Sequence, residues 1–131
     1  MKKIIAITAF CALVLLIAPG CYKVATVRLD NSPAITKSVS LSKDIVPIFS
    51  KNCALSGCHS SGGHVPDLSV NDAYNSLIKG KYIDISSPSN SALYLWLTGK
   101  KAESMPLGSS NNPSDINALT LAWITQGANN N

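Results

Sequence analysis

A seven-residue segment from Cys53 to His59 limits what this chain can fold into more than any other feature. It contains two cysteines separated by four residues, and a histidine directly follows the second one. The chain has 131 residues, which leaves room for a single domain once any targeting segment is removed. The other two cysteines, Cys11 and Cys21, lie near the N-terminus. Two thiols and one imidazole therefore lie close together in any fold of this chain, and the fold has to accommodate their chemistry.

The N-terminus has the residue order of an export signal. Lys2 and Lys3 precede an uncharged apolar run, residues 4–18, which ends at Pro19-Gly20. A spanning helix needs about 20 apolar residues, so this run is short for an uncleaved membrane anchor, which remains the alternative. We expect residues 1–20 to be a signal peptide and the protein to be exported.

Cys21 follows this leader in a sequence that resembles the lipobox of bacterial lipoproteins, whose cysteine becomes the acylated first residue. The family usually has Leu three residues before the cysteine, where this chain has Ala18. Several acyl chains anchor a protein firmly, whereas one chain binds only marginally. We expect lipidation at Cys21, a flexible tether over residues 21–41 and a domain over 42–131, with ordinary cleavage near Gly20 as the alternative. The protein would then be anchored to a membrane and face the periplasm or the cell surface.

Export makes the chemistry of the two remaining cysteines informative. In an oxidising compartment, Cys53 and Cys58 are not expected to stay as unused thiols. In c-type haem attachment, two thiols add to the haem vinyl groups and the histidine after the second cysteine binds the iron. The usual motif has two residues between the cysteines, and here residues 54–57 make four. We expect one covalent c-type haem held by Cys53, Cys58 and His59.

Two different uses of the same residues remain open. A disulfide between Cys53 and Cys58 would satisfy the redox argument but would leave His59 without a role. A zinc site from both cysteines, His59 and His64 would have the ligand number and types of a closed tetrahedral site. An adjacent cysteine and histidine fit one small ion poorly, and exported zinc thiolates compete with oxidation, so haem is the favoured interpretation.

Helix start and stop signals divide the body into four short helices and predict an all-α fold. The predicted ranges are Asp44–Asn52, Ser69–Lys79, Ser89–Thr98 and a last helix from Asn112 and Pro113 to just before Gly127. The third segment is apolar throughout and could by periodicity be a buried strand, but its flanking residues favour a helix. We expect Trp96 and Trp123 in the core. So small a body gains only marginal stability from apolar burial, which a large bound cofactor would increase.

Met105 is the candidate for the second axial iron ligand. The chain has two methionines, and Met1 leaves with the leader, so Met105 is the only one in the mature chain. It lies between the third and fourth predicted helices, next to Pro106, which would stiffen the loop that presents the thioether. Met105 as loop packing is the alternative. His64 is the other possible ligand, but it follows His59 by only five residues and would have to reach the opposite haem face.

The order of these features resembles a class I c-type cytochrome domain over residues 43–129. The matching stretches are Phe49 to Cys53, Cys58-His59, Ala73 to Leu77, Gly80 to Tyr82, Met105-Pro106 and Trp123-Ile124. The resemblance implies about four short helices wrapped around one covalent haem, with first and last helices crossing and Phe49 against the Trp123 face. It also implies electron transfer without catalysis, with His59 and Met105 as axial ligands. If Met105 were absent from the iron, a five-coordinate haem could sense gas or react with peroxide instead.

The net charge and the positions of the lysines indicate which classes of partner the protein could bind. The formal net charge is +4 and falls when Lys2 and Lys3 leave with the leader, so nucleic-acid binding is not expected. Four lysines flank predicted helix ends and could dock an acidic redox protein, although such lysines also serve helix C-termini: Lys79, Lys81, Lys100 and Lys101. We expect redox proteins and, through the lipid anchor, a membrane as partners.

Overall fold

A computed structural model describes residues 34–101, 104–107 and 114–131. The expected signal peptide, the lipidated Cys21 and most of the tether lie outside these residues, as do Asn112 and Pro113 at the expected start of the last helix. The described residues form helices and connecting loops without β-strands, so the all-α prediction is confirmed. None of the helices in the described ranges is long and apolar enough to cross a membrane.

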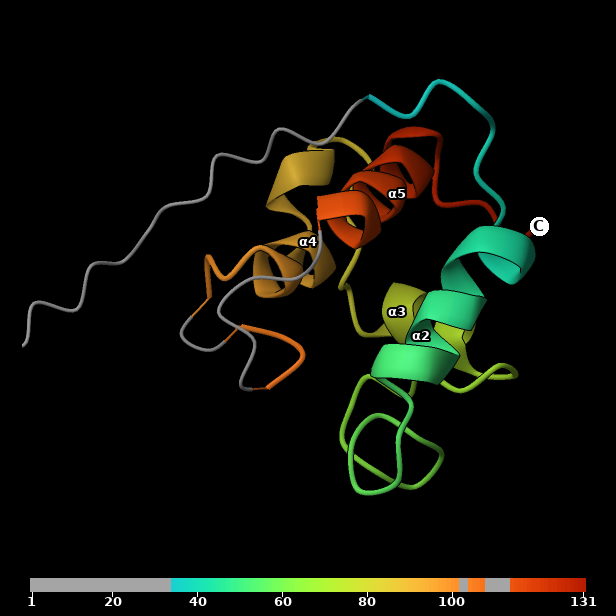
Figure 1. Ribbon diagram of the computed structural model, residues 1–131, viewed down its shortest axis with the longest axis vertical. Coiled ribbons are helices and arrows are strands. Elements are labelled where there is room, and N and C mark those ends of the chain that lie inside the picture. Colours follow the sequence, from blue (N-terminus) through green and yellow to red (C-terminus); the bar gives the residue numbers. More distant parts are fainter. Residues whose placement is uncertain (1–33, 102–103, 108–113) are drawn as a thin grey trace, which may run out of the picture.

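Six short helical elements make up this part of the chain (Figure 1). They are the π-helical turn η1 (Leu41–Ile45), α2 (Val46–Asn52), α3 (Ala73–Lys79), the 3₁₀ turn η2 (Pro88–Asn90), α4 (Ala92–Leu97) and α5 (Ser114–Thr125). The last helix, α5, packs against η1, η2 and α4. A long loop, residues 53–72, leaves the end of α2 and forms the lower end of the molecule in Figure 1 before α3 begins.

The first helix starts before the predicted N-cap, Asp44, which is a correction. Ser40 is the N-cap, and its hydroxyl accepts a hydrogen bond from the Lys43 backbone N–H at 3.3 Å. The Asp44 carboxylate accepts from the Ser40 backbone N–H at 2.9 Å and from the Lys37 ammonium at 2.8 Å. This exchange is a capping box one residue longer than usual, because the first turn is π-helical.

The C-terminal tail completes this helix start. The Asn131 side-chain oxygen accepts from the Leu41 backbone N–H at 2.9 Å, and the Asn131 backbone oxygen accepts from the Ser42 N–H at 2.8 Å. Gln126 also pairs with the incoming chain, because its side chain accepts from the Val39 N–H and donates to the Lys37 carbonyl. Orphan N–H groups of the first turn thus find partners in the tail. Residues 37–41, which precede the expected domain boundary at residue 42, are thus hydrogen-bonded to the C-terminal tail.

The second and third predicted helices are shorter than expected. Ser69 lies in a turn, where its carbonyl accepts from the Ala73 N–H at 2.9 Å, and the α-helix begins only at Ala73. The third segment is a helix rather than a strand, but it is broken at Ser91, which has extended backbone angles. The Ser91 hydroxyl accepts from the Asp84 backbone N–H at 2.9 Å, which holds Ser91 out of helical geometry and separates η2 from α4.

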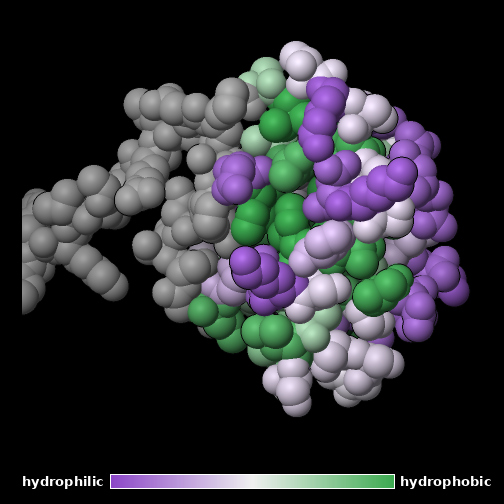
Figure 2. Space-filling model, turned by 45° about the vertical axis from the view of Figure 1, so that its right-hand side comes forward, coloured by the Kyte–Doolittle hydropathy of each residue, from purple (hydrophilic) through white to green (hydrophobic). Residues whose placement is uncertain are grey.

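The core lies where η1, α2, α3, α4 and α5 converge. Its most deeply buried apolar side chains are Ile45, Phe49, Leu77, Trp123 and Ile124. Phe49 and Trp123 belong to the same buried cluster, and the first and last helical elements, η1 and α5, are in contact. The core prediction for Trp123 is confirmed, whereas the one for Trp96 is wrong, because Trp96 is only partly buried and lines a cavity. Hydrophobic side chains also reach the surface between hydrophilic ones on the face drawn in Figure 2.

Candidate haem site

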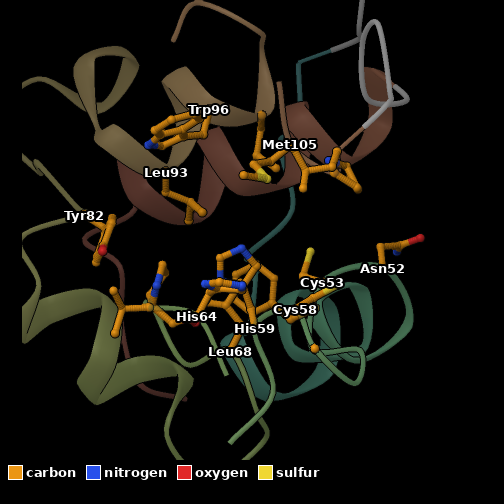
Figure 3. Close-up of a pocket in the computed structure, with 17 residues that line it drawn as sticks. Asn52, Cys53, Cys58, His59, His64, Leu68, Tyr82, Leu93, Trp96 and Met105 are labelled. Carbon is orange, nitrogen blue, oxygen red and sulfur yellow. The ribbon is translucent and has the colours of Figure 1, made fainter. Parts of the chain in front are cut away.

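A cavity of about 570 Å³ brings the predicted site residues together. Its lining includes Cys53, Cys58, His59 and Met105. Figure 3 shows Met105 on one side with Leu93 and Trp96 of α4, and the two cysteines and His59 on the other side. The volume lies within the range of about 300–1,000 Å³ that is usual for ligand and cofactor sites. The loop after α2 and the loop after α4 therefore face each other across a space of cofactor size.

The described residues that line the cavity are largely apolar, and no Asp, Glu, Lys or Arg is among them. The lining residues are Phe49, Asn52, Cys53, Gly57, Cys58, His59, His64, Val65, Pro66, Leu68, Tyr82, Leu93, Trp96, Leu97, Met105, Pro106 and Leu107. The four lysines that flank predicted helix ends are not among them. Such a lining suits a large, mainly apolar ligand with a few polar groups that fix its orientation.

The His59 ring is held through one of its two nitrogens. Nδ1 lies 3.0 Å from the Pro66 carbonyl oxygen and 3.2 Å from the His64 carbonyl oxygen. A carbonyl can only accept, so Nδ1 is the donor in this contact, which leaves Nε2 as the nitrogen with the lone pair when the ring is neutral. Metal-binding histidines usually donate their second ring N–H in this way, which fixes the ring and makes the ligating nitrogen more basic. The ring of His59 is thus prepared to bind a metal through Nε2.

The segment between the cysteines contains a hydrogen-bonded turn, which runs from Leu55 to Cys58. The Cys58 backbone N–H donates to the Leu55 carbonyl at 2.9 Å, and Gly57 at the third position of this turn has a φ of +77°. Positive φ at that position is the signature of a type II turn, which favours glycine. The His59 N–H then donates to the Cys53 carbonyl at 3.1 Å, which closes the loop from the first cysteine to the histidine. The wider spacing is therefore absorbed by a turn, and Cys53, Cys58 and His59 still line one cavity.

The two thiols differ in exposure. Cys53 is partly buried and Cys58 is exposed, and both are free thiols in the structure rather than a disulfide. Burial raises the pKa of the Cys53 thiol to about 11, and the neighbouring Cys58 contributes to this rise. Cys53 is therefore protonated at neutral pH.

The geometry also bears on the zinc hypothesis and on His64 as an iron ligand. Among the described residues, no three His, Cys, Asp or Glu side chains form a group that could share one metal ion, although both cysteines and both histidines lie within the described ranges. His64 is exposed and lies on the same side of the cavity as His59 (Figure 3). It is therefore not placed to bind the opposite face of a flat cofactor. Met105 lies across the cavity, and its backbone N–H donates to the Trp96 carbonyl at 3.1 Å, which ties its loop to α4.

Three residues that shape the site were not assigned to it from sequence. Pro66 supplies the carbonyl for His59, and Tyr82 and Trp96 form part of the cavity wall. The spacing Gly80-Lys81-Tyr82 is the only sequence signal that points to one of them. A backbone acceptor such as the Pro66 carbonyl carries no sequence mark, because every residue has one.

No protein-family model, no curated protein and no solved structure matches this chain. Any assignment of the site therefore rests on its own residues and their geometry.

Proposed function

We propose that this chain is an electron-transfer protein that carries one covalent c-type haem, with His59 and Met105 as axial ligands. The observation that carries the proposal is the orientation of His59, whose Nδ1–H is bonded to the Pro66 carbonyl inside a cavity that both cysteines and Met105 also line. A disulfide would explain neither the cavity nor the held imidazole.

The residues present fit a haem by chemistry and size. Cys53 and Cys58 would form the thioether bonds to the vinyl groups, His59 Nε2 would bind the iron, and Met105 would supply the second axial ligand. The apolar lining provides the surface that a porphyrin ring would bury. When bound, the haem supplies a reversible one-electron couple between ferric and ferrous iron.

The protein groups around the site would set the reduction potential of the haem. A methionine and histidine pair favours the ferrous form and raises the reduction potential, and a water-poor apolar wall acts in the same direction. Cys58, His64 and Val65 are exposed at the rim of the cavity, Val65 at 78%. A cofactor edge near this rim would be within reach of a redox partner, which supports a carrier rather than an enzyme. Met105 in the lining argues against a five-coordinate sensor or peroxidase.

The proposal includes the location of the protein. The leader and the lipobox-like sequence before Cys21 favour export and anchoring to a membrane through acyl chains. Covalent haem attachment needs two reduced thiols and takes place after export. Export and two free cysteines are therefore both required by the proposed function.

The test is to produce the full chain in a host that exports proteins and attaches haem. We expect the denatured polypeptide to gain the mass of one haem and to keep haem-dependent peroxidase staining. A variant with both Cys53→Ser and Cys58→Ser should lose both signals, and a Cys11→Ser variant should keep them as the control. An exported wild-type chain with neither signal would contradict the proposal.

A further inference from the structure

The loop that follows the candidate iron ligand folds back onto the carbonyl of the second cysteine. The Gly63 backbone N–H donates to the Ser60 carbonyl at 2.8 Å, and the His64 backbone N–H donates to the Cys58 carbonyl at 2.7 Å. Residues 61–65 of this loop are exposed. Because a surface segment has little packing around it, the shape of the loop depends mainly on these backbone hydrogen bonds.

Gly63 lies so close to the Cys58 carbonyl that only glycine fits there. A Cβ at Gly63 would overlap the carbonyl oxygen of Cys58 and would lie 3.0 Å from that of Ser60. Both obstacles are backbone atoms, which cannot move aside as the end of a flexible side chain can. The neighbouring Gly62 differs, because a Cβ there meets no atom within 4 Å and its φ of +77° is what favours glycine. Close approach thus requires glycine at position 63, and backbone conformation favours it at position 62.

The same loop carries both acceptors of the His59 ring. The carbonyl oxygens of His64 and Pro66 lie 3.2 Å and 3.0 Å from Nδ1. His64 directly follows Gly63, so a displacement of Gly63 moves the His64 carbonyl. The far end of the loop is held separately, because Pro66 is buried and the Leu68 N–H donates to the His59 carbonyl at 2.8 Å. The ring N–H is thus shared between one acceptor whose position depends on Gly63 and a second acceptor that is fixed independently.

We propose that Gly63 is a positioning residue for the axial imidazole, because its close approach to the Cys58 carbonyl sets the hydrogen bond between His59 and the loop and thereby the reduction potential of the haem. This inference rests on the proposed function. The role is indirect, since Gly63 is not among the residues that line the cavity. Donation by Nδ1–H makes Nε2 more basic, and a more basic ligand stabilises ferric iron. A weaker hydrogen bond should therefore raise the reduction potential.

The test compares Gly63→Ala with Gly62→Ala in the haem-loaded full chain. Both changes add one methyl group to the same exposed loop, and both should lower stability, Gly62→Ala because of its positive φ. Only Gly63→Ala should raise the reduction potential above that of the wild type. It should also accelerate hydrogen exchange of the His59 Nδ1–H, followed by NMR, at least about tenfold, because a weaker hydrogen bond opens more often. Gly62→Ala should keep the wild-type potential and exchange rate.

The same potential in the two variants, whether raised or unchanged, would overturn the role of Gly63. A second measurement needs no variant. In the wild type, exchange of the His64 backbone N–H should be slowed at least about tenfold relative to an unfolded chain, since this group donates to the Cys58 carbonyl. An unprotected His64 N–H would overturn the proposal even if Gly63→Ala failed to fold. A wild-type chain without haem would instead overturn the proposed function, and the role of Gly63 with it.

Discussion

At the scale of single residues, the site depends on how two side chains are held before any cofactor arrives. His59 donates through Nδ1 to backbone carbonyls of the loop that follows it, and the Cys53 thiol is kept protonated by burial. Nε2 and the two thiols are the groups that covalent haem attachment uses. The local structure thus brings one imidazole and two thiols to the same cavity, and none of the described residues that line it is charged at the side chain as Asp, Glu, Lys or Arg.

Met105→Ala tests the axial assignment. Loss of the thioether should remove the low-spin methionine signature from the spectra of the haem-loaded protein and open the iron to carbon monoxide, because a coordination position is vacated. Absorption spectra of both oxidation states with and without carbon monoxide provide the measurement. Leu107→Ala is the control, since Leu107 also lines the cavity but is 68% exposed and has no ligating atom. Spectra equal to those of the control would remove Met105 from the iron.

Gly57→Ala tests the turn that accommodates the wide cysteine spacing. An added Cβ at Gly57 meets no atom within 4 Å, so any effect comes from the φ of +77°. A non-glycine residue in this region costs about 1–2 kcal/mol, and we expect the free energy of unfolding to fall by that amount. Denaturant unfolding of the haem-loaded protein measures it, with Ser56→Ala in the same turn as the control. Equal stability of the two variants would mean that the turn can take another conformation.

At the scale of the elements, helix ends were predictable where one residue marks them. Gly80 and Gly127 end α3 and the turn after α5, as their positions in the sequence suggest. The start of the first helix depends on Asn131, which lies 90 residues from Leu41 in the chain. The break at Ser91 depends on Asp84, outside the helix. Periodicity reports only neighbours along one helix, so neither contact could be predicted.

In the candidate site, too, some residues could be predicted from their neighbours in the sequence, whereas others depend on contacts between distant segments. Cys53, Cys58, His59 and Met105 follow from adjacency and elimination, which need no knowledge of the loop path. The position of Trp96 was mispredicted because apolar character alone cannot say whether a side chain faces a core or a cavity. Only the folded loops reveal which face of α4 the ligand would meet.

Asp44→Asn tests the start of the first helix through its pH dependence. The hydrogen bond from Lys37, followed by that from the Ser40 N–H, lowers the pKa of Asp44 below its usual 3.8. The folded pKa lies below the unfolded one, so this stabilisation is present above the unfolded pKa and is lost as the pH falls through the folded pKa. The variant should therefore melt below the wild type at pH 7, and the gap should narrow below about pH 4.

Circular dichroism melting curves at several pH values measure this difference. Asp72→Asn is the control, because the exposed Asp72 side chain makes no capping hydrogen bond. A stability difference between wild type and Asp44→Asn that stays constant down to about pH 2 would show that the charge of Asp44 is not the cause.

At the scale of the whole molecule, the entry of the described chain and the loop with the two cysteines lie at different ends. The chain enters the body at residues 34–41, in the upper part of Figure 1, while the loop with the two cysteines lies at the lower end. Hydrogen bonds of Gln126 and Asn131 fasten the incoming segment to the tail. In this view, the described chain thus begins at the end opposite the loop that carries the two cysteines.

Cys21→Ser tests the anchor. We expect the variant to leave the membrane fraction and to stay exported with its haem, because the acyl chains supply the membrane affinity and the domain is untouched. Fractionation followed by haem staining measures both properties. Cys11→Ser, a change within the leader, should stay with the membrane. A Cys21→Ser protein that still sediments with membranes would contradict lipidation.

The fastening of residues 37–41 to the tail has a consequence for the reach of an anchored domain. Lys37 is the first of the described residues with a hydrogen bond to the C-terminal tail, so the stretch from Cys21 to Lys37 sets an upper limit on the distance between Cys21 and this point of the domain. Fully extended, that stretch spans at most about 55 Å. If Cys21 is lipidated, this span limits the distance from the membrane at which the domain can meet a partner. Deletions within the segment should therefore first prevent contact with the partners that lie farthest from the membrane.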